Sequence, residues 1–151
     1  MDGKPVVVVA VLFPDVTQLD LTGPAEVFAK TPGIDFHVAA AGSEPVPTDC
    51  GFTIGADVTF VDSPAADVLM VPGGRGVDHA MGDPDLIRFV RGQARSARWV
   101  TSVCTGSLPL VRRAASARRA ANWDPAGLEE LIPEERRQDN GEADTAFPDK
   151  R

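Results

Sequence analysis

Residues 99–107 read WVTSVCTGS: a β-branched, largely apolar run leads into Cys104, and small residues then open a predicted helix. A strand that turns abruptly into a helix exposes the side chain at the bend and directs the next backbone N–H groups to the same place. The positive end of the helix dipole favours the thiolate there, which is the nucleophilic form of cysteine. Cys104 is therefore a candidate nucleophile. The alternative is a structural cysteine that ends a strand in the core.

The segments before this stretch alternate between strand-like and helix-like patterns. Continuous apolar runs at 6–12, 36–41 and 67–72 are typical of strands buried on both faces of a parallel sheet. Helical spacing follows at 25–30, at 83–94 and after Cys104. Residues 46–54 indicate a hairpin or a pair of edge strands. The order of these segments predicts an α/β fold with a mostly parallel sheet and helices on both faces.

Three candidate site residues or pairs follow strand ends. Ligands of such sheets bind beyond the carboxyl ends of the strands, so we expect Asp20, Gly73–Gly74 and Cys104 to share one rim. Glycines let the backbone come close to a ligand, and the N–H groups of Gly74 and Thr105 then predict an oxyanion-type pocket beside the sulfur. The alternative for the glycine pair is a plain turn.

Asp20 is flanked by apolar residues, which predicts partial burial. Burial favours the protonated form of a carboxyl group and suits it to general acid–base catalysis. The alternative is that Asp20 is the N-cap of the helix that follows. The two histidines are weaker candidates for a base: His37 lies inside an apolar strand and is expected in the core, and His79 is expected to be a solvated residue near a helix start.

Composition excludes several classes of function. A net charge of −7 argues against a nucleic-acid partner or an anionic membrane surface, and no segment is apolar enough to span a bilayer. Two histidines and two isolated cysteines show no metal-ligand spacing, and Gly73–Gly76 fits neither a phosphate loop nor a dinucleotide fingerprint. The start of the chain lacks the layout of a signal peptide, and two unrelated cysteines suggest no disulfide framework, so we expect a cytoplasmic protein.

The last quarter of the chain differs in character from the rest. From Arg112 to Arg151, 17 of 40 residues are charged, and residues 138–151 show no periodicity. We therefore expect one domain over residues 1–132 and a polar, poorly ordered tail over residues 133–151.

The motifs together resemble the DJ-1/PfpI (ThiJ) superfamily of class I glutamine-amidotransferase-like folds, with the closest similarity to its isonitrile hydratase branch. The resemblance rests on residues 13–24 (FPDVTQLDLTGP), 71–74 (VPGG) and 101–106 (TSVCTG), in order and in spacing. It implies a flavodoxin-like three-layer sandwich, usually a homodimer, with Cys104 at a nucleophile elbow. Asp20 matches the acidic residue that contacts this cysteine in the family, and Thr105 matches the residue after it.

The resemblance implies a cysteine-dependent lyase that hydrates isonitriles to N-substituted formamides. The thiolate attacks the isonitrile carbon, the acid passes protons, and water releases the product without a metal or an organic cofactor. Two other functions fit the same motifs. One is a non-catalytic small-molecule-binding domain like the sensory half of some AraC-type regulators. The other is DJ-1-like thiol stress chemistry, such as aldehyde detoxification or redox sensing.

The match is clear to about residue 111 and weakens after it. Asn122 stands where the family commonly carries a histidine, and a late strand with its helices is expected to be missing. The chain resembles a C-terminally shortened member in which the effect of this difference on activity is open.

Overall fold

The computed structural model of the protein describes residues 4–110. The predictions for Asn122, for the late strand and helices, and for the tail over residues 133–151 lie outside the described residues. The same holds for the predicted domain end at residue 132.

A parallel sheet forms the centre of the described part. Its strands lie in the order β5-β2-β1-β6-β7, and every neighbouring pair is parallel. The bounds are β1 (Val6–Val11), β2 (Ile34–Ala40), β5 (Val58–Thr59), β6 (Val68–Val71) and β7 (Trp99–Ser102). The buried residues of β1 and β6 are apolar, as expected of central strands covered on both faces. The predicted mostly parallel sheet is confirmed.

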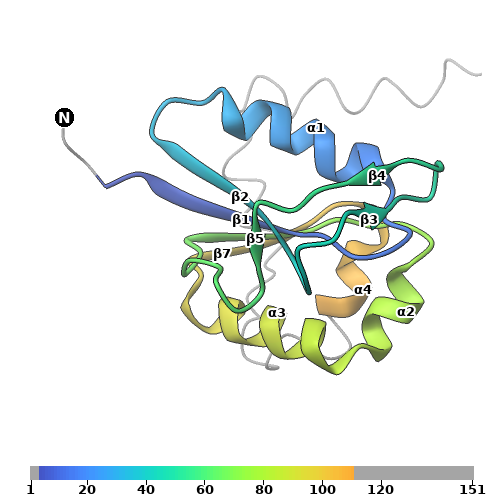
Figure 1. The fold of residues 1–151 in the computed structure, drawn as a ribbon. Coiled ribbons are helices and arrows are strands. Elements are labelled where there is room, and N and C mark those ends of the chain that lie inside the picture. The colour runs from blue at the N-terminus through green and yellow to red at the C-terminus, as the bar shows by residue number, and fades with distance from the viewer. Residues whose placement is uncertain (1–3, 111–151) are drawn as a thin grey trace, which may run out of the picture. The chain divides into compact units, whose positions relative to one another are not determined.

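Helices cover both faces of this sheet (Figure 1). The helix α1 (Gln18–Ala29) lies on one face, where Phe28 stacks on Phe36 at 5.9 Å between ring centroids. On the other face lie α2 (Val77–Gly82), α3 (Pro84–Ser96) and the short α4 (Ser107–Pro109). There Phe60 stacks on Phe89 at 4.3 Å. The three predicted layers are therefore present in the described residues.

A small hairpin stands apart from the main sheet. Its strands are β3 (Val46–Pro47) and β4 (Thr53–Ile54), which pair antiparallel, as predicted for residues 46–54. The turn between them contains Cys50 and reaches the carboxyl end of β1, where Val16 bridges to Thr48. The hairpin thus belongs to the rim on which the candidate site residues were predicted.

The first helix begins earlier than its sequence pattern predicted. It starts at Gln18 rather than at residue 25, and it contains Pro24 in its interior. Proline has no N–H to donate and usually ends a helix, so the sequence pattern with Gly23–Pro24 did not indicate a helix over the first half of α1. Asp20 consequently lies in the first turn of α1, and the N-cap is Thr17, which corrects the alternative reading of Asp20 as the N-cap.

One buried amide side chain secures the segment that leads into β6. Gln93 is 9% exposed; its Oε1 accepts from the N–H of Ala66 at 2.9 Å, and its Nε2 donates to the Pro64 carbonyl at 2.9 Å. The variant Gln93→Leu keeps the volume but leaves both backbone groups without partners. We expect it to lower the free energy of unfolding by about 2 kcal/mol in urea titrations.

The matched control is Gln18→Leu, which removes a half-buried hydrogen bond from Thr22 at 2.8 Å. Its cost is expected to stay within about 0.5 kcal/mol, because water replaces the lost partner. Equal costs for the two glutamine variants would show that the Gln93 contacts do not hold this segment.

Candidate active site

The topology of the sheet selects one place for a ligand. After β2 the chain adds β5 on the outer side of β2 and then crosses to the other side of β1 to form β6, so α1 after β1 and α2 after β6 lie on opposite faces of the sheet. In open α/β sheets, ligands bind at this switch point, beyond the carboxyl ends of the strands. Asp20 follows β1, Gly73–Gly74 follows β6 and Cys104 follows β7. All three therefore stand at the carboxyl edge, at or beside the switch point.

Cys104 occupies a strained bend between strand and helix. Val103 is extended, with φ −116° and ψ 139°, whereas Cys104 has a φ of 50°, and Cys104–Gly106 form a turn of 3₁₀ helix. A positive φ is uncommon for a residue with a Cβ and is found at functional sites where the surroundings enforce it. The side chain of Cys104 is exposed. The bend has the geometry of a nucleophile elbow, and the alternative of a core cysteine is wrong.

Close packing against β6 enforces this bend. The N–H of Val103 donates to the Val71 carbonyl at 3.0 Å, and the N–H of Gly106 donates to the Val103 carbonyl at 2.9 Å. A Cβ atom on Gly106 would lie 2.1 Å from the Val71 carbonyl oxygen and 2.6 Å from that of Pro72. Only glycine fits at this position, because both neighbours are backbone atoms of the adjacent strand end.

Gly73 brings the acidic residue and the elbow together. Its N–H donates to Asp20 Oδ2 at 3.2 Å. A Cβ atom on Gly73 would lie 2.9 Å from the same oxygen, 2.7 Å from Thr105 N and 2.8 Å from Thr105 Oγ1. Asp20 Oδ2 and the amide nitrogen of Thr105 therefore both lie within 2.9 Å of one point, the position that a Cβ atom on Gly73 would occupy. Gly73 thus lies beside groups from two segments that are distant from it in the sequence.

The N–H of Gly74 is hydrogen-bonded to the side chain of Thr105, the residue that follows Cys104. Gly74 has a φ of 140°, and its N–H donates to Thr105 Oγ1 at 3.1 Å. The oxyanion-type role predicted for this N–H therefore requires the threonine hydroxyl to give way to the ligand. Sequence reasoning placed the Gly74 and Thr105 amides side by side but did not foresee that the Thr105 hydroxyl occupies the Gly74 N–H.

Two residues that sequence reasoning left aside also join the site. Thr17 donates its N–H to the Gly73 carbonyl at 3.0 Å, and its hydroxyl donates to Asp49 Oδ2 at 2.6 Å. The two residues are 32 positions apart; Thr17 lies in the motif at residues 13–24, but Asp49 belongs to none of the quoted motifs. No local pattern in the sequence could have paired them.

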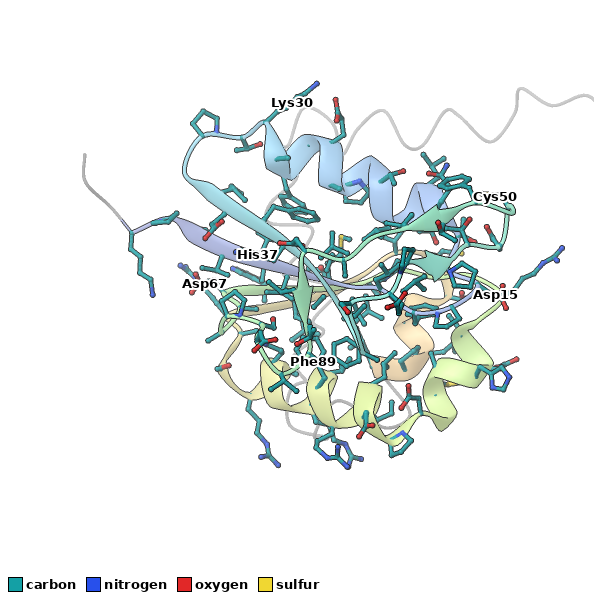
Figure 2. The ribbon with its side chains drawn as sticks, in the orientation of Figure 1. Asp15, Lys30, His37, Cys50, Asp67 and Phe89 are labelled. Atoms are coloured by element: carbon teal, nitrogen blue, oxygen red, sulfur yellow. The ribbon has the colours of Figure 1, made fainter. Side chains whose placement is uncertain are left out.

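Neither histidine is among the groups that approach Gly73. Figure 2 shows Asp15 and Cys50 at one end of the sheet and Asp67 at the other, with His37 on the Asp67 side. His79 is exposed in α2, as expected. Among residues 4–110, no group of three or more His, Cys, Asp or Glu side chains is arranged to hold a metal ion. An apolar cavity of about 240 Å³ opens beside Leu12, Val46 and Phe60, and none of the predicted site residues lines it.

His37 is only partly buried, so its expected place in the core is not observed, and it is held between two carboxylates. Its Nδ1 lies 2.9 Å from Asp57 Oδ2, and its Nε2 lies 3.2 Å from Asp35 Oδ1. Burial lowers the pKa of His37, but the hydrogen bonds to Asp57 and Asp35 and their negative charges outweigh it, so the pKa is raised above its usual value.

The raised pKa of His37 predicts a pH-dependent stability. The folded state binds the proton more tightly, so the stabilisation is fully present below about pH 6.5 and is lost as the pH rises through the folded pKa. It amounts to at most about 1 kcal/mol, because both carboxylates are half exposed. Urea titrations from pH 5.5 to 8.5 measure this effect. We expect the free energy of unfolding of His37→Gln to fall below that of the parent near pH 5.5 and to equal it near pH 8.5. The control His79→Gln should follow the parent throughout; a constant deficit of His37→Gln would contradict the assignment.

The DJ-1/PfpI family matches residues 6–135 of the chain. An isonitrile hydratase of Pseudomonas putida is 48% identical over 99 residues, which cover 66% of this chain and 43% of that protein. An HTH-type transcriptional regulator of Mycobacterium tuberculosis is 40% identical over 62 residues, or 41% of this chain and 24% of the regulator. A crystal structure of a ThiJ/PfpI family protein from Pseudomonas syringae superimposes with a TM-score of 0.68 at 32% identity, covering 70% of this chain and 45% of the other.

The chain thus spans less than half the length of each of these three proteins. The match with a solved ThiJ/PfpI structure confirms the predicted flavodoxin-like α/β fold. Within residues 4–110, no helix is long and apolar enough to cross a membrane.

Proposed function

The chain belongs to the DJ-1/PfpI family, and we propose that it is a lyase of the isonitrile hydratase type with Cys104 as its nucleophile. The observation that carries the proposal is the meeting at Gly73, where the Asp20 carboxylate and the amide that follows Cys104 approach one point. A reactive thiol needs a proton carrier and a donor of hydrogen bonds beside it. The 48% identity to an isonitrile hydratase supports the choice of reaction.

The proposed reaction proceeds in two stages at one carbon atom. The thiolate of Cys104 forms a bond to the terminal carbon of R–N≡C, and that carbon takes a proton to give the thioimidate Cys–S–CH=N–R. Water then adds to the same carbon, the nitrogen takes a proton, and the C–S bond breaks. The products are R–NH–CHO and the restored thiolate, so the overall change is the addition of one water molecule.

Asp20 is the proton carrier in this scheme. Its carboxylate stands in the first turn of α1 and already accepts one backbone N–H, from Gly73, which fixes the position of the second oxygen. General acid–base catalysis requires the carboxyl group to stay within hydrogen-bond reach of the reacting atoms. The amides of Gly74 and Thr105 lie beside this carboxylate and stabilise negative charge on the substrate, Gly74 after the Thr105 hydroxyl has turned aside, while the Gly73 N–H stays on Asp20.

The test is direct turnover of isonitriles by the purified chain. Alkyl and aryl isonitriles of increasing size are mixed with the protein, and the formyl proton of the product is followed by NMR. We expect one formamide for each isonitrile consumed, at a rate proportional to the protein concentration. Absence of formamide across the whole series would contradict the proposal.

A second candidate function is small-molecule sensing without turnover. The 40% identity over 62 residues to a protein named as an HTH-type transcriptional regulator favours it. Calorimetry separates the two functions: a sensor binds its ligand with the same affinity in the parent and in Cys104→Ala and releases it unchanged. Formation of formamide would support the enzyme and contradict the sensor.

We also propose that the protein is a cytoplasmic homodimer that pairs through the outer face of α1. Leu19 and Val27, two turns apart on this helix, are 65% and 64% exposed. Large apolar side chains on one exposed helix face mark an interaction surface. A reducing compartment is consistent with the two unpaired cysteines.

Light scattering on a sizing column tests the pairing. We expect twice the chain mass for the parent and one chain mass for Leu19→Glu with Val27→Lys, since burying two unpaired charges costs several kcal/mol. The control Val61→Lys alters another exposed valine, which is 91% exposed and lies just after β5, and should remain a dimer. A parent protein with the mass of one chain would contradict the proposed dimer.

A further inference from the structure

Thr17 is an N-cap residue that does not cap its helix. It stands directly before α1 with extended backbone angles, φ −72° and ψ 111°, but its side chain makes no capping hydrogen bond. A threonine at this position usually accepts a bond from the second or third N–H of the helix. Here the hydroxyl donates instead to Asp49 Oδ2 at 2.6 Å, on the turn between β3 and β4.

Asp49 is tied to the same segment by a second bond. Its backbone N–H donates to the Val16 carbonyl at 3.1 Å, so both its main chain and its carboxylate hold residues 16 and 17. Val16 in turn bridges to Thr48 on one side and to Gly74 on the other. The hairpin turn is therefore joined edge to edge with the segment that precedes α1.

Thr17 connects this anchor to the site through a closed ring of hydrogen bonds. The Thr17 N–H donates to the Gly73 carbonyl at 3.0 Å, and the Thr17 carbonyl accepts from the Asp20 N–H at 3.0 Å. The ring closes where the Gly73 N–H donates to Asp20 Oδ2 at 3.2 Å. A shift of Thr17 must therefore move the Asp20 carboxylate, the Gly73 amide or both.

We propose that Asp49 is a positioning residue that fixes the Asp20 carboxylate against Gly73 by holding the hydroxyl of Thr17. The proposal rests on the role of Asp20 in the proposed function, but it concerns how the carboxylate is placed. The carboxylate of Asp49 keeps the Thr17 hydroxyl away from the first turn of α1, and its backbone N–H holds Val16. Asp49 itself touches no reacting atom.

Amide hydrogen exchange measures this placement without any substrate. The Gly73 N–H is buried, and its partner is Asp20 Oδ2, so its exchange rate reports how well the carboxylate is held. We expect exchange about tenfold faster in Thr17→Val and in Asp49→Ala, which is the range for losing a hydrogen bond to a charged group. The double variant should exchange no faster than either single one, because both remove the same bond.

Conservative and matched variants separate positioning from general destabilisation. Thr17→Ser and Asp49→Asn keep a donor and an acceptor, so we expect the Gly73 amide to exchange within about threefold of the parent. Thr59→Val removes a threonine–aspartate bond of the same 2.6 Å length, to Asp62, on the segment after β5. It should leave the Gly73 amide unchanged.

Kinetics then show whether this positioning serves catalysis. With an isonitrile substrate, Thr17→Val and Asp49→Ala should lower kcat by about tenfold with little change in KM, and Thr17→Ser should restore it. Faster Gly73 exchange in a protein that turns over no isonitrile would uphold the positioning role and reject the proposed function. Unchanged Gly73 exchange, or equally accelerated exchange throughout residues 4–110, would overturn the positioning role whatever the activity.

Discussion

Replacing Cys104 by alanine is expected to lower isonitrile turnover by a factor of about 10⁴ or more. The proposed reaction passes through a bond between the sulfur and the isonitrile carbon, and alanine has no nucleophilic atom to form that bond. Loss of a covalent nucleophile typically removes nearly all of the rate enhancement, because the residues of such a site act as a unit. The methyl group of alanine is smaller than the thiol-bearing side chain, and the position is exposed, so the fold should be preserved.

The second free thiol provides the control for this experiment. Cys50 is also exposed, and it lies on the hairpin turn beside Thr48, with Oγ1 and Sγ 3.3 Å apart. Cys50→Ser keeps a polar group at that distance and should retain the turnover of the parent. Equal losses in the two variants, or turnover by Cys104→Ala at the parent rate, would contradict the assignment of the nucleophile. Initial rates of formamide release measure both.

Replacing Gly106 by alanine is expected to destabilise the protein by about 3 kcal/mol and to abolish turnover. The new methyl group would meet the carbonyl oxygens of Val71 at 2.1 Å and of Pro72 at 2.6 Å, which belong to the backbone at the end of β6. Neither oxygen can move without displacing the strand, so the turn at Cys104–Gly106 must shift away from the end of β6. Because Cys104 and Thr105 are carried on that elbow, the loss of activity should exceed what partial unfolding alone explains.

Gly92 is the matched control for the added methyl group. It lies inside α3 with nothing within 4 Å of the position where a Cβ would be placed. Gly92→Ala should raise the free energy of unfolding by up to about 1 kcal/mol, because alanine favours the helix. Urea titrations and formamide assays on both variants measure the contrast. A Gly106→Ala protein as stable and as active as the parent would show that the packing of the elbow is not required.

The parts of this site that could be predicted from sequence are those encoded locally. The run from Trp99 to Gly106 carries a strand, a bend and a glycine within eight residues, and the bend is observed at Cys104. The rim could be predicted because the carboxyl ends of parallel strands meet at one edge, wherever the strands lie in the sequence. Asp20 and Gly73 were both expected at this rim, and a hydrogen bond of 3.2 Å joins them.

The contacts that sequence reasoning could not provide depend on the tertiary fold. The bond from Thr17 to Asp49 joins two ordinary turn-type residues on separate segments, and only the docking of the hairpin brings them together. The same holds for the Gly74 N–H, which an exposed threonine hydroxyl occupies from 31 residues away. The start of α1 was misplaced for a local reason, since Gly23–Pro24 contradicts helix propensity and tertiary packing overrides it.

The most direct test of the central claim is a single-turnover experiment with the parent protein and an isonitrile labelled at its terminal carbon. Samples quenched in acid at successive times are digested with trypsin, which separates Cys104 in the peptide 99–112 from Cys50 in the peptide 31–75. We predict that the mass of one isonitrile appears on peptide 99–112 and disappears as labelled formamide forms, while peptide 31–75 stays unlabelled. Formamide that forms without any labelling of peptide 99–112, or with labelling of peptide 31–75 instead, would contradict the role of Cys104.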